Sequence, residues 1–118
     1  YKYLLIRPVS YIRNVIGKST WNTVIPTPTH PEYSAAHATI SGASQKILES
    51  LFGKNYAFID HTHDALYGPR SYSSFDDYAN QSGWSRVLAG VHYKPSVDIA
   101  LIAGRKVDDF IKTIPLKK

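Results

Sequence analysis

Two arginines and two histidines in this chain of 118 residues have the side-chain types that bind a tetrahedral oxyanion. They are Arg7 in the segment IRP, His37 in SAAH, and Arg86 and His92 in SRVLAGVH. An arginine presents a planar fork of N–H donors that holds two oxygens of such an anion at once. A neutral imidazole can act as a nucleophile, a metal ligand or a proton carrier. Together the four residues predict an oxyanion site with acid–base capacity.

A helix start beside His37 supplies further donors. The pattern predicts a helix over residues 35–52, with Ser34 as its N-cap and Gly53 as its stop. Its apolar positions recur at helical spacing: Ile40, Ala43, Ile47 and Leu51. The backbone N–H groups of Ala35, Ala36 and His37 would project from its first turn. The helix dipole favours an anion at that end.

The remaining pattern is also helical. Pro8 predicts a helix start or a kink within residues 3–16, and the prolines of residues 17–33 predict an extended loop. A second helix should begin at Ser74, capped with the help of Asp77, and end near Asn80–Ser82, before Gly83. A third should run from about Pro95–Ser96 to Lys112, with Ala100, Ala103 and Gly104 as a small-residue packing face.

Residues 54–72 are polar and predict a loop, and no segment alternates with the period of a strand. The predicted class is therefore all-α, a helical bundle. Three or four helices are too few to enclose a site, so we expect partner helices outside this chain.

The amino-acid composition excludes several kinds of site and indicates the charge of a partner. The chain has neither cysteine nor methionine, which excludes disulfides, cysteine-ligated zinc and iron–sulfur clusters. Its net charge of +5 favours an anionic partner. The basic residues are scattered, so we do not expect nucleic-acid binding. The chain has no run of about 18 apolar residues, and we predict no transmembrane segment.

The segment DHTHD, residues 60–64, has the composition of a metal site, with two histidines between two aspartates. Its spacing provides neither a helical pair of ligands nor an obvious distant third ligand. We therefore favour a solvated loop, or a rim that contributes to substrate access.

The spacing of the arginines and histidines resembles the signature shared by vanadium-dependent haloperoxidases and type 2 phosphatidic acid phosphatases. That signature is a lysine seven residues before Arg-Pro, then Pro-Ser-Gly-His, then Ser-Arg with a histidine six residues after the arginine. Arg7-Pro8 is similar to the end of the first part, Ser34–His37 to the second, and Ser85-Arg86 with His92 to the third. The flanking segments HPEY, ATISGA, GVHY and GRKV look most like bacterial haloperoxidase-type members.

The resemblance implies that residues 1–118 are the C-terminal part of a single helical domain of the haloperoxidase and acid-phosphatase type. His92 would be the apical ligand to vanadium in bound vanadate, or the nucleophile that accepts a phosphoryl group. Arg7 and Arg86 would neutralise the equatorial oxygens, with the N–H of Ala36 as a further donor. His37 would be the acid–base group. Phosphate can occupy the same site as vanadate.

This sequence departs from the family pattern at several positions. The family lysine would fall one position before Tyr1, and Ala35 stands where the family has serine. Ser34 stands where proline is usual, and its hydroxyl could partly substitute. The phosphatases orient the last histidine with an aspartate four residues on. That position here is Ser96, and Asp98, two further on, is the supporting candidate. His30 and Glu32 are family-like flanks with no assigned chemistry.

Three functions remain open from the sequence. The leading prediction is vanadate-dependent oxidation of halide by hydrogen peroxide. The first alternative is hydrolysis of a phosphate ester through a phosphohistidine at His92. The second is a non-catalytic homologue that binds phosphate or another anion. The resemblance is compatible with a periplasmic or extracellular location, which no residue of the chain itself indicates.

Overall fold

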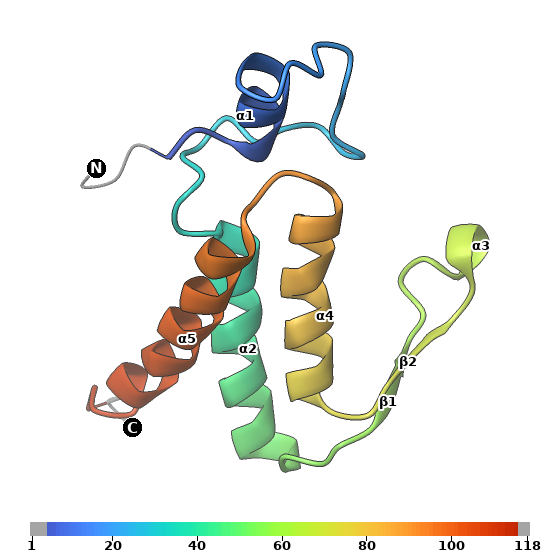
Figure 1. Ribbon diagram of the computed structural model, residues 1–118. Helices are drawn as coiled ribbons and strands as arrows, with labels where there is room; N and C mark the ends of the chain where they lie inside the picture. The colour runs from blue at the N-terminus through green and yellow to red at the C-terminus, as the bar shows by residue number, and fades with distance from the viewer. Residues whose placement is uncertain (1–4, 116–118) are drawn as a thin grey trace.

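Three long helices form the body of the protein. The computed structural model describes residues 5–115 of the chain. Helices α2 (Ala36–Phe52), α4 (Phe75–Leu88) and α5 (Lys94–Ile111) lie side by side, and the short helix α1 (Pro8–Asn14) lies across one end of them (Figure 1). A hairpin of β1 (Phe58–Asp60) and β2 (Arg70–Tyr72), with the one-turn helix α3 (Asp64–Tyr67) at its tip, extends to one side. The predicted all-α bundle is confirmed.

The core is built from small side chains because the helices approach closely. Helix α2 packs most extensively against α5 and then against α4. A Cβ added to Gly42 would lie 2.5 Å from the carbonyl oxygen of Leu101, and one added to Gly104 would lie 2.0 Å from that of Thr39. Backbone therefore meets backbone at the α2–α5 contact. The buried hydrophobic cluster consists of Ala35, Ala38, Ala79, Val97, Ala100 and Leu101.

Two predictions about helix ends were wrong. Helix α4 does not stop before Gly83 but continues to Leu88. Gly83 is buried against α5, where an added Cβ would lie 2.9 Å from Cγ1 of Val97. The glycine permits helix packing there and does not end the helix.

At the start of α2, the N-cap position is Ala35 and no side chain caps it, so Ser34 is not the cap. Of the predicted small-residue face on α5, Ala103 is exposed, whereas Ala100 and Gly104 are buried.

Other helix signals are confirmed. Pro8 occupies the first turn of α1, and Gly53 follows α2 with a φ of 93°. Ser74 accepts a hydrogen bond from the backbone N–H of Asp77 at the start of α4, at 3.0 Å. Helix α5 has the predicted bounds to within about two residues, a normal uncertainty for helix ends.

The hairpin was not predicted. Its strands have three residues each, too few to show alternation, and they pair antiparallel with Phe58 opposite Tyr72. Aromatic side chains hold it against the start of α4. Phe58 stacks on Phe75 with ring centroids 5.2 Å apart, and Tyr72 meets Tyr78 edge to face at 5.1 Å.

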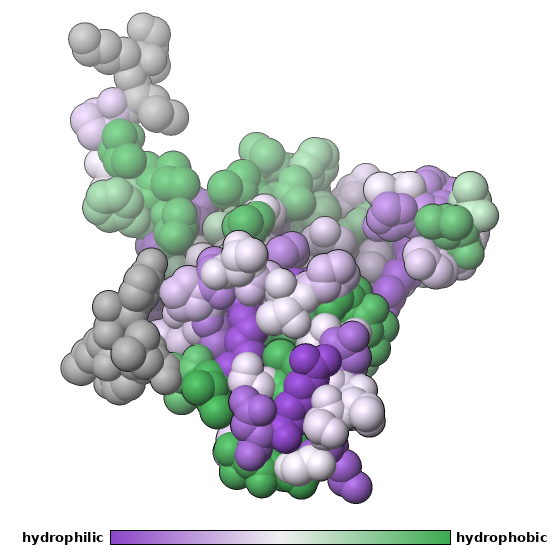
Figure 2. Space-filling model, turned by 90° about the horizontal axis from the view of Figure 1, so that it is seen from above, coloured by the Kyte–Doolittle hydropathy of each residue, from purple (hydrophilic) through white to green (hydrophobic). Residues whose placement is uncertain are grey.

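Much apolar surface is exposed over the described residues. The exposed fraction reaches 81% for Val24, 69% for Leu51 and 67% for Leu88, and hydrophobic patches are visible in Figure 2. The radius of gyration is 16.7 Å. A closed domain of this length would have about 13.5 Å. The chain is therefore extended for its length, with α1 and the hairpin projecting from the three-helix body (Figure 1). None of the helices in the described part is long and apolar enough to cross a membrane.

Candidate anion-binding site

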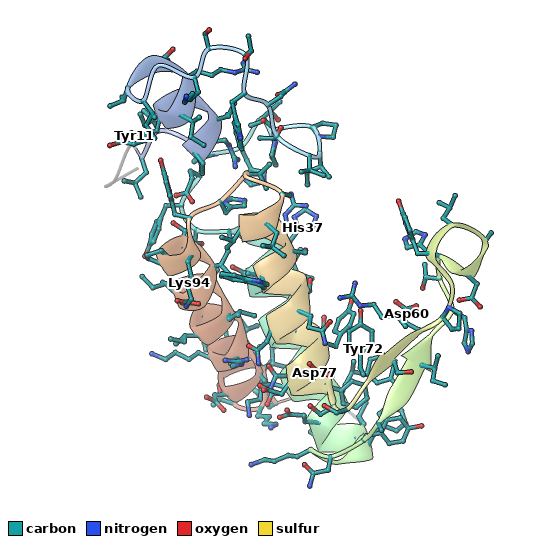
Figure 3. All side chains as sticks on the ribbon, turned by 45° about the vertical axis from the view of Figure 1, so that its right-hand side comes forward. Tyr11, His37, Asp60, Tyr72, Asp77 and Lys94 are labelled. Carbon is teal, nitrogen blue, oxygen red and sulfur yellow. The ribbon has the colours of Figure 1, made fainter. Side chains whose placement is uncertain are left out.

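The predicted site residues come together at one end of the helical body. The start of α1 carries Arg7, the start of α2 carries His37, the end of α4 carries Arg86, and the α4–α5 connection carries His92. All four segments lie at the end of the body that faces α1 (Figure 1). Figure 3 labels His37 at this end. Residues up to 85 positions apart in sequence are thereby placed in one region.

The turn after α4 fixes the spacing between Arg86 and His92. The carbonyl oxygen of Arg86 accepts hydrogen bonds from the N–H groups of Val91, at 3.2 Å, and of His92, at 3.3 Å. Gly90 makes this return possible because its φ is 76°, in the left-handed region. An added Cβ at Gly90 would lie 2.4 Å from the indole ring of Trp21. The loop before α2 therefore packs directly on the turn that presents His92.

Glu32 is the carboxylate beside His92, a role that the sequence pattern does not predict. One of its oxygens, Oε1, lies 3.4 Å from Nδ1 of His92, and both side chains are fully buried. The two groups are within contact distance, but they are not aligned for a strong hydrogen bond, and they would form an ion pair only if the ring were protonated. Glu32 also accepts hydrogen bonds from the N–H of Tyr93, at 2.9 Å, and from the hydroxyl of Ser96, at 2.8 Å.

Asp98 was the predicted orienting carboxylate, and this prediction was wrong. Asp98 lies on α5, where Oδ2 accepts from Nζ of Lys94 at 2.5 Å in a largely solvent-exposed pair. Ser96, at the family's aspartate position, contacts Glu32 instead. The carboxylate beside His92 is therefore supplied from a segment about 60 residues earlier in the chain, which local spacing could not reveal.

Arg7 is buried, and backbone carbonyl groups hold its guanidinium. Nη1 donates to the carbonyl of Val91 at 2.6 Å, and Nη2 donates to that of His30 at 2.5 Å. These bonds tie the start of α1 to the segments before α2 and after α4. Because guanidinium has five N–H donors, the bonds fix its charge beside His92 without using every donor.

Arg86 and His92 carry the polar atoms that lack partners. Nε of Arg86 and both ring nitrogens of His92, Nδ1 and Nε2, are buried and have no hydrogen-bond partner among the described residues. Leaving a buried donor or acceptor unpaired costs about 1–3 kcal/mol. A tetrahedral oxyanion held between them would satisfy the N–H of Arg86, and vanadate would also take the lone pair of His92. The donor set thus fits vanadate or phosphate.

The first turn of α2 adds backbone donors and the more exposed histidine. The first backbone hydrogen bond of α2 runs from Thr39 to Ala35, so the N–H groups of Ala36, His37 and Ala38 precede it. The His37 side chain is exposed at this turn. Ala35 is fully buried and contributes no hydroxyl.

Burial is the main cause of the pKa shifts in this region, and neighbouring charges modify its effect. Burial lowers the pKa of His92, and the charge of Arg7 lowers it further, while Glu32 opposes both effects. Burial likewise lowers the pKa of His37, followed by the charge of Arg86. The pKa of Arg7 is lowered first by burial; Glu32 opposes this effect and the charge of Arg86 adds to it. This end of the protein is therefore electropositive and would gain from a bound anion.

A hollow of about 660 Å³ opens beside Arg86. Its walls include Val24, Tyr67, Trp84 and Leu88, so they are mainly apolar and aromatic. It lies between the α3 end of the hairpin, the end of α4 and the loop before α2. The guanidinium region can therefore be approached from this side.

The DHTHD segment forms a local turn. His61 pairs with Asp64 at 2.7 Å, and Asp60 accepts from the hydroxyl and the N–H of Thr62. Within residues 5–115, no group of three histidine, aspartate or glutamate side chains is arranged to hold a metal ion.

The fold thus defines a helical-bundle domain with an electropositive end. The family profile described as "VCPO second helical-bundle domain" matches residues 1–114. The chain belongs to this family, within the superfamily of vanadium haloperoxidases and type 2 phosphatidic acid phosphatases.

Solved structures agree with this assignment. The crystal structure of "the first bacterial vanadium dependant iodoperoxidase" matches with a TM-score of 0.83 and 36% identity over 92% of this chain. Holo-type and apo-type bacterial vanadium-dependent chloroperoxidases match with TM-scores of 0.72 over 87% of the chain, at 20% and 21% identity, which shows the fold alone. This chain spans 26% of the iodoperoxidase and 28–29% of the chloroperoxidases. No curated protein matched.

Proposed function

We propose that this protein is part of a vanadate-dependent haloperoxidase, which oxidises halide with hydrogen peroxide. The observation that carries the proposal is the set of buried, unpartnered nitrogens: Nε of Arg86 and the two ring nitrogens of His92. The similarity to a bacterial iodoperoxidase, at 36% identity, supports the choice of reaction.

Each of the four site residues would have a distinct role around bound vanadate. Nε2 of His92 would ligate vanadium, while Arg86, Arg7 and the N–H of Ala36 neutralise and orient the oxygens. Vanadate supplies a Lewis acid that activates peroxide toward halide. His37, exposed at the first turn of α2, would take up and return protons at its imidazole.

The exposed apolar surface supports the expected partner helices. We propose that residues 1–118 are the C-terminal part of one helical domain and that N-terminal helices of the same protein cover these side chains. Val24, Leu51 and Leu88 are each more than 60% exposed. Exposed apolar patches of this kind mark contact surfaces.

A phosphatase is the second candidate, and the contact between Glu32 and His92 is compatible with it, as it is with a vanadium ligand. A carboxylate 3.4 Å from Nδ1 would favour the tautomer with the lone pair on Nε2, the atom that would act as nucleophile in this reaction. A P–N bond to Nε2 forms while the P–O bond to the alkoxide breaks, and His37 gives its proton to the leaving oxygen. Water then hydrolyses the phosphohistidine and releases phosphate.

A non-catalytic anion-binding homologue is the third candidate. Ala35 favours it because the buried position at the start of α2 has a methyl group where the family pattern has a hydroxyl. One hydrogen bond to the anion is absent from such a site.

Two parallel assays on the intact protein separate the three. Bromination of a trap compound is followed with vanadate, peroxide and bromide, and release from a chromogenic phosphate ester is followed without vanadate. Bromination that requires vanadate and is lost in His92→Ala is the expected result. Phosphate release that vanadate inhibits would replace this proposal with the phosphatase. Inactivity in both assays with retained phosphate binding would leave the third candidate. His61→Ala, in the exposed hairpin, is the matched control and should match the wild type.

A further inference from the structure

We propose that Glu32 positions His92, fixing the ring orientation and the tautomer in which Nδ1 carries the hydrogen and Nε2 carries the lone pair. The importance of Nε2 rests on the proposed function. The assignment of Glu32 itself rests only on the geometry of the described residues.

The carboxylate is anchored more firmly than the histidine. Hydrogen bonds from the N–H of Tyr93, at 2.9 Å, and from the hydroxyl of Ser96, at 2.8 Å, hold its two oxygens separately. Oε1 then lies 3.4 Å from Nδ1 of His92. Both side chains are fully buried, so solvent does not compete for either group.

The chemistry of the groups sets the tautomer. An ionised carboxylate only accepts hydrogen bonds, so it favours the imidazole nitrogen that bears hydrogen on the side facing it. The other nitrogen of a neutral ring then has the free lone pair. Carboxylate–histidine pairs of this kind orient ligating histidines and raise their basicity. Neither ring nitrogen has a hydrogen bond of good geometry among residues 5–115, but only Nδ1 has the Glu32 carboxylate beside it, at 3.4 Å. Nε2 is therefore the nitrogen left for a ligand.

Glu32 also has a structural role that must be separated from this one. By accepting from Tyr93 and Ser96, it satisfies donors at the start of α5, where Tyr93 is the N-cap and has no side-chain cap of its own. Loss of Glu32 would therefore disturb α5 even if the tautomer of His92 were irrelevant. Ser96→Ala removes one of these α5 contacts and leaves the approach to Nδ1 intact, so it is the matched control.

The test is ¹⁵N NMR of the ring nitrogens in the intact, ligand-free protein, labelled on histidine and held near pH 8, where a histidine of ordinary pKa is neutral. His92→Gln assigns the His92 signals. We expect the wild type and Ser96→Ala to show Nδ1–H and an unprotonated Nε2. Glu32→Gln, which keeps the size of the side chain, should show a mixture of tautomers. Its affinity for inorganic phosphate should fall about 10-fold, as for other orienting partners.

Three outcomes decide the proposal. A wild-type His92 with hydrogen on Nε2 overturns it, whether or not Glu32→Gln folds. A folded Glu32→Gln with the wild-type tautomer and phosphate affinity also overturns it and leaves only the role at α5. A shifted tautomer in Glu32→Gln, together with no halogenation or phosphatase activity in the wild type, supports Glu32 and overturns only the enzymatic function.

Discussion

The backbone carbonyl of Arg86 accepts a hydrogen bond from the backbone N–H of His92, at 3.3 Å, across the turn that ends α4. Two side chains six positions apart are therefore held by one closed turn and do not depend on a flexible loop. This bond is the structural basis of the Ser-Arg…His spacing. It also makes the geometry of the pair sensitive to the residues that form the turn.

For anion affinity, the planar pair of N–H donors on Arg86 should matter more than its positive charge. In Arg86→Lys the positive charge stays, but Nε–H and the planar pair of donors are lost. We expect the affinity of the intact protein for phosphate or vanadate to fall about 10- to 100-fold, the effect of one or two hydrogen bonds to a charged group. Isothermal titration calorimetry measures this. Arg70→Lys, in the hairpin, is the control, and an equal loss there would show that general charge dominates.

Gly90 should be far less replaceable than Gly17, although both have a similar φ, 76° and 78°. Gly90→Ala meets the indole of Trp21, whereas Gly17→Ala meets nothing within 4 Å. Both should lose about 1–2 kcal/mol of unfolding free energy from the left-handed backbone. Gly90→Ala should lose more and also weaken phosphate binding, because the turn carries His92. Denaturant unfolding and phosphate titration check this, and equal effects would contradict it.

The pKa of His37 should rise when an anion binds. Burial and the charge of Arg86 hold this pKa below 6.5 in the free protein. A bound dianion offsets that charge, so the bound form holds the proton to higher pH. Binding then takes up a proton, and affinity should increase as pH falls through the range between the free and bound pKa values.

Sulfate suits this experiment because it stays a dianion throughout the range. NMR titration of the His37 ring with and without sulfate measures the shift directly. The signals of His61, in the exposed hairpin, should not respond to sulfate. An unchanged His37 pKa with sulfate bound would place the anion away from α2.

Ala35→Ser should strengthen the site. The added hydroxyl would lie at the N-cap of α2, where no side chain caps the helix. We expect about 0.5–2 kcal/mol of added stability from capping. If the hydroxyl instead turns to the anion, phosphate affinity should rise about 10-fold. Thermal unfolding and calorimetry distinguish the two. Reduced stability without tighter binding would mean that the buried position has no room for the oxygen.

The sequence predicted the helices well because their signals are local. Pro8, Gly53 and the pair Ser74 and Asp77 mark helix ends by their own backbone chemistry. Gly83 looked like a helix stop in the sequence, but the glycine is needed for packing against α5, because Val97 occupies the space that a side chain would fill. The hairpin was missed because aromatic packing, and not alternation along its short strands, holds it in place.

For the candidate site, residue types and spacing identified the four side chains Arg7, His37, Arg86 and His92. This was possible because each residue type has a characteristic chemistry and because Arg86 and His92 are only six positions apart. Only the tertiary structure decided which groups lie next to these side chains. It placed Glu32, and not Asp98, beside His92, and it turned two guanidinium nitrogens of Arg7 toward carbonyl groups. Such contacts join segments up to 84 residues apart, and which buried donor meets which acceptor depends on packing that no local pattern encodes.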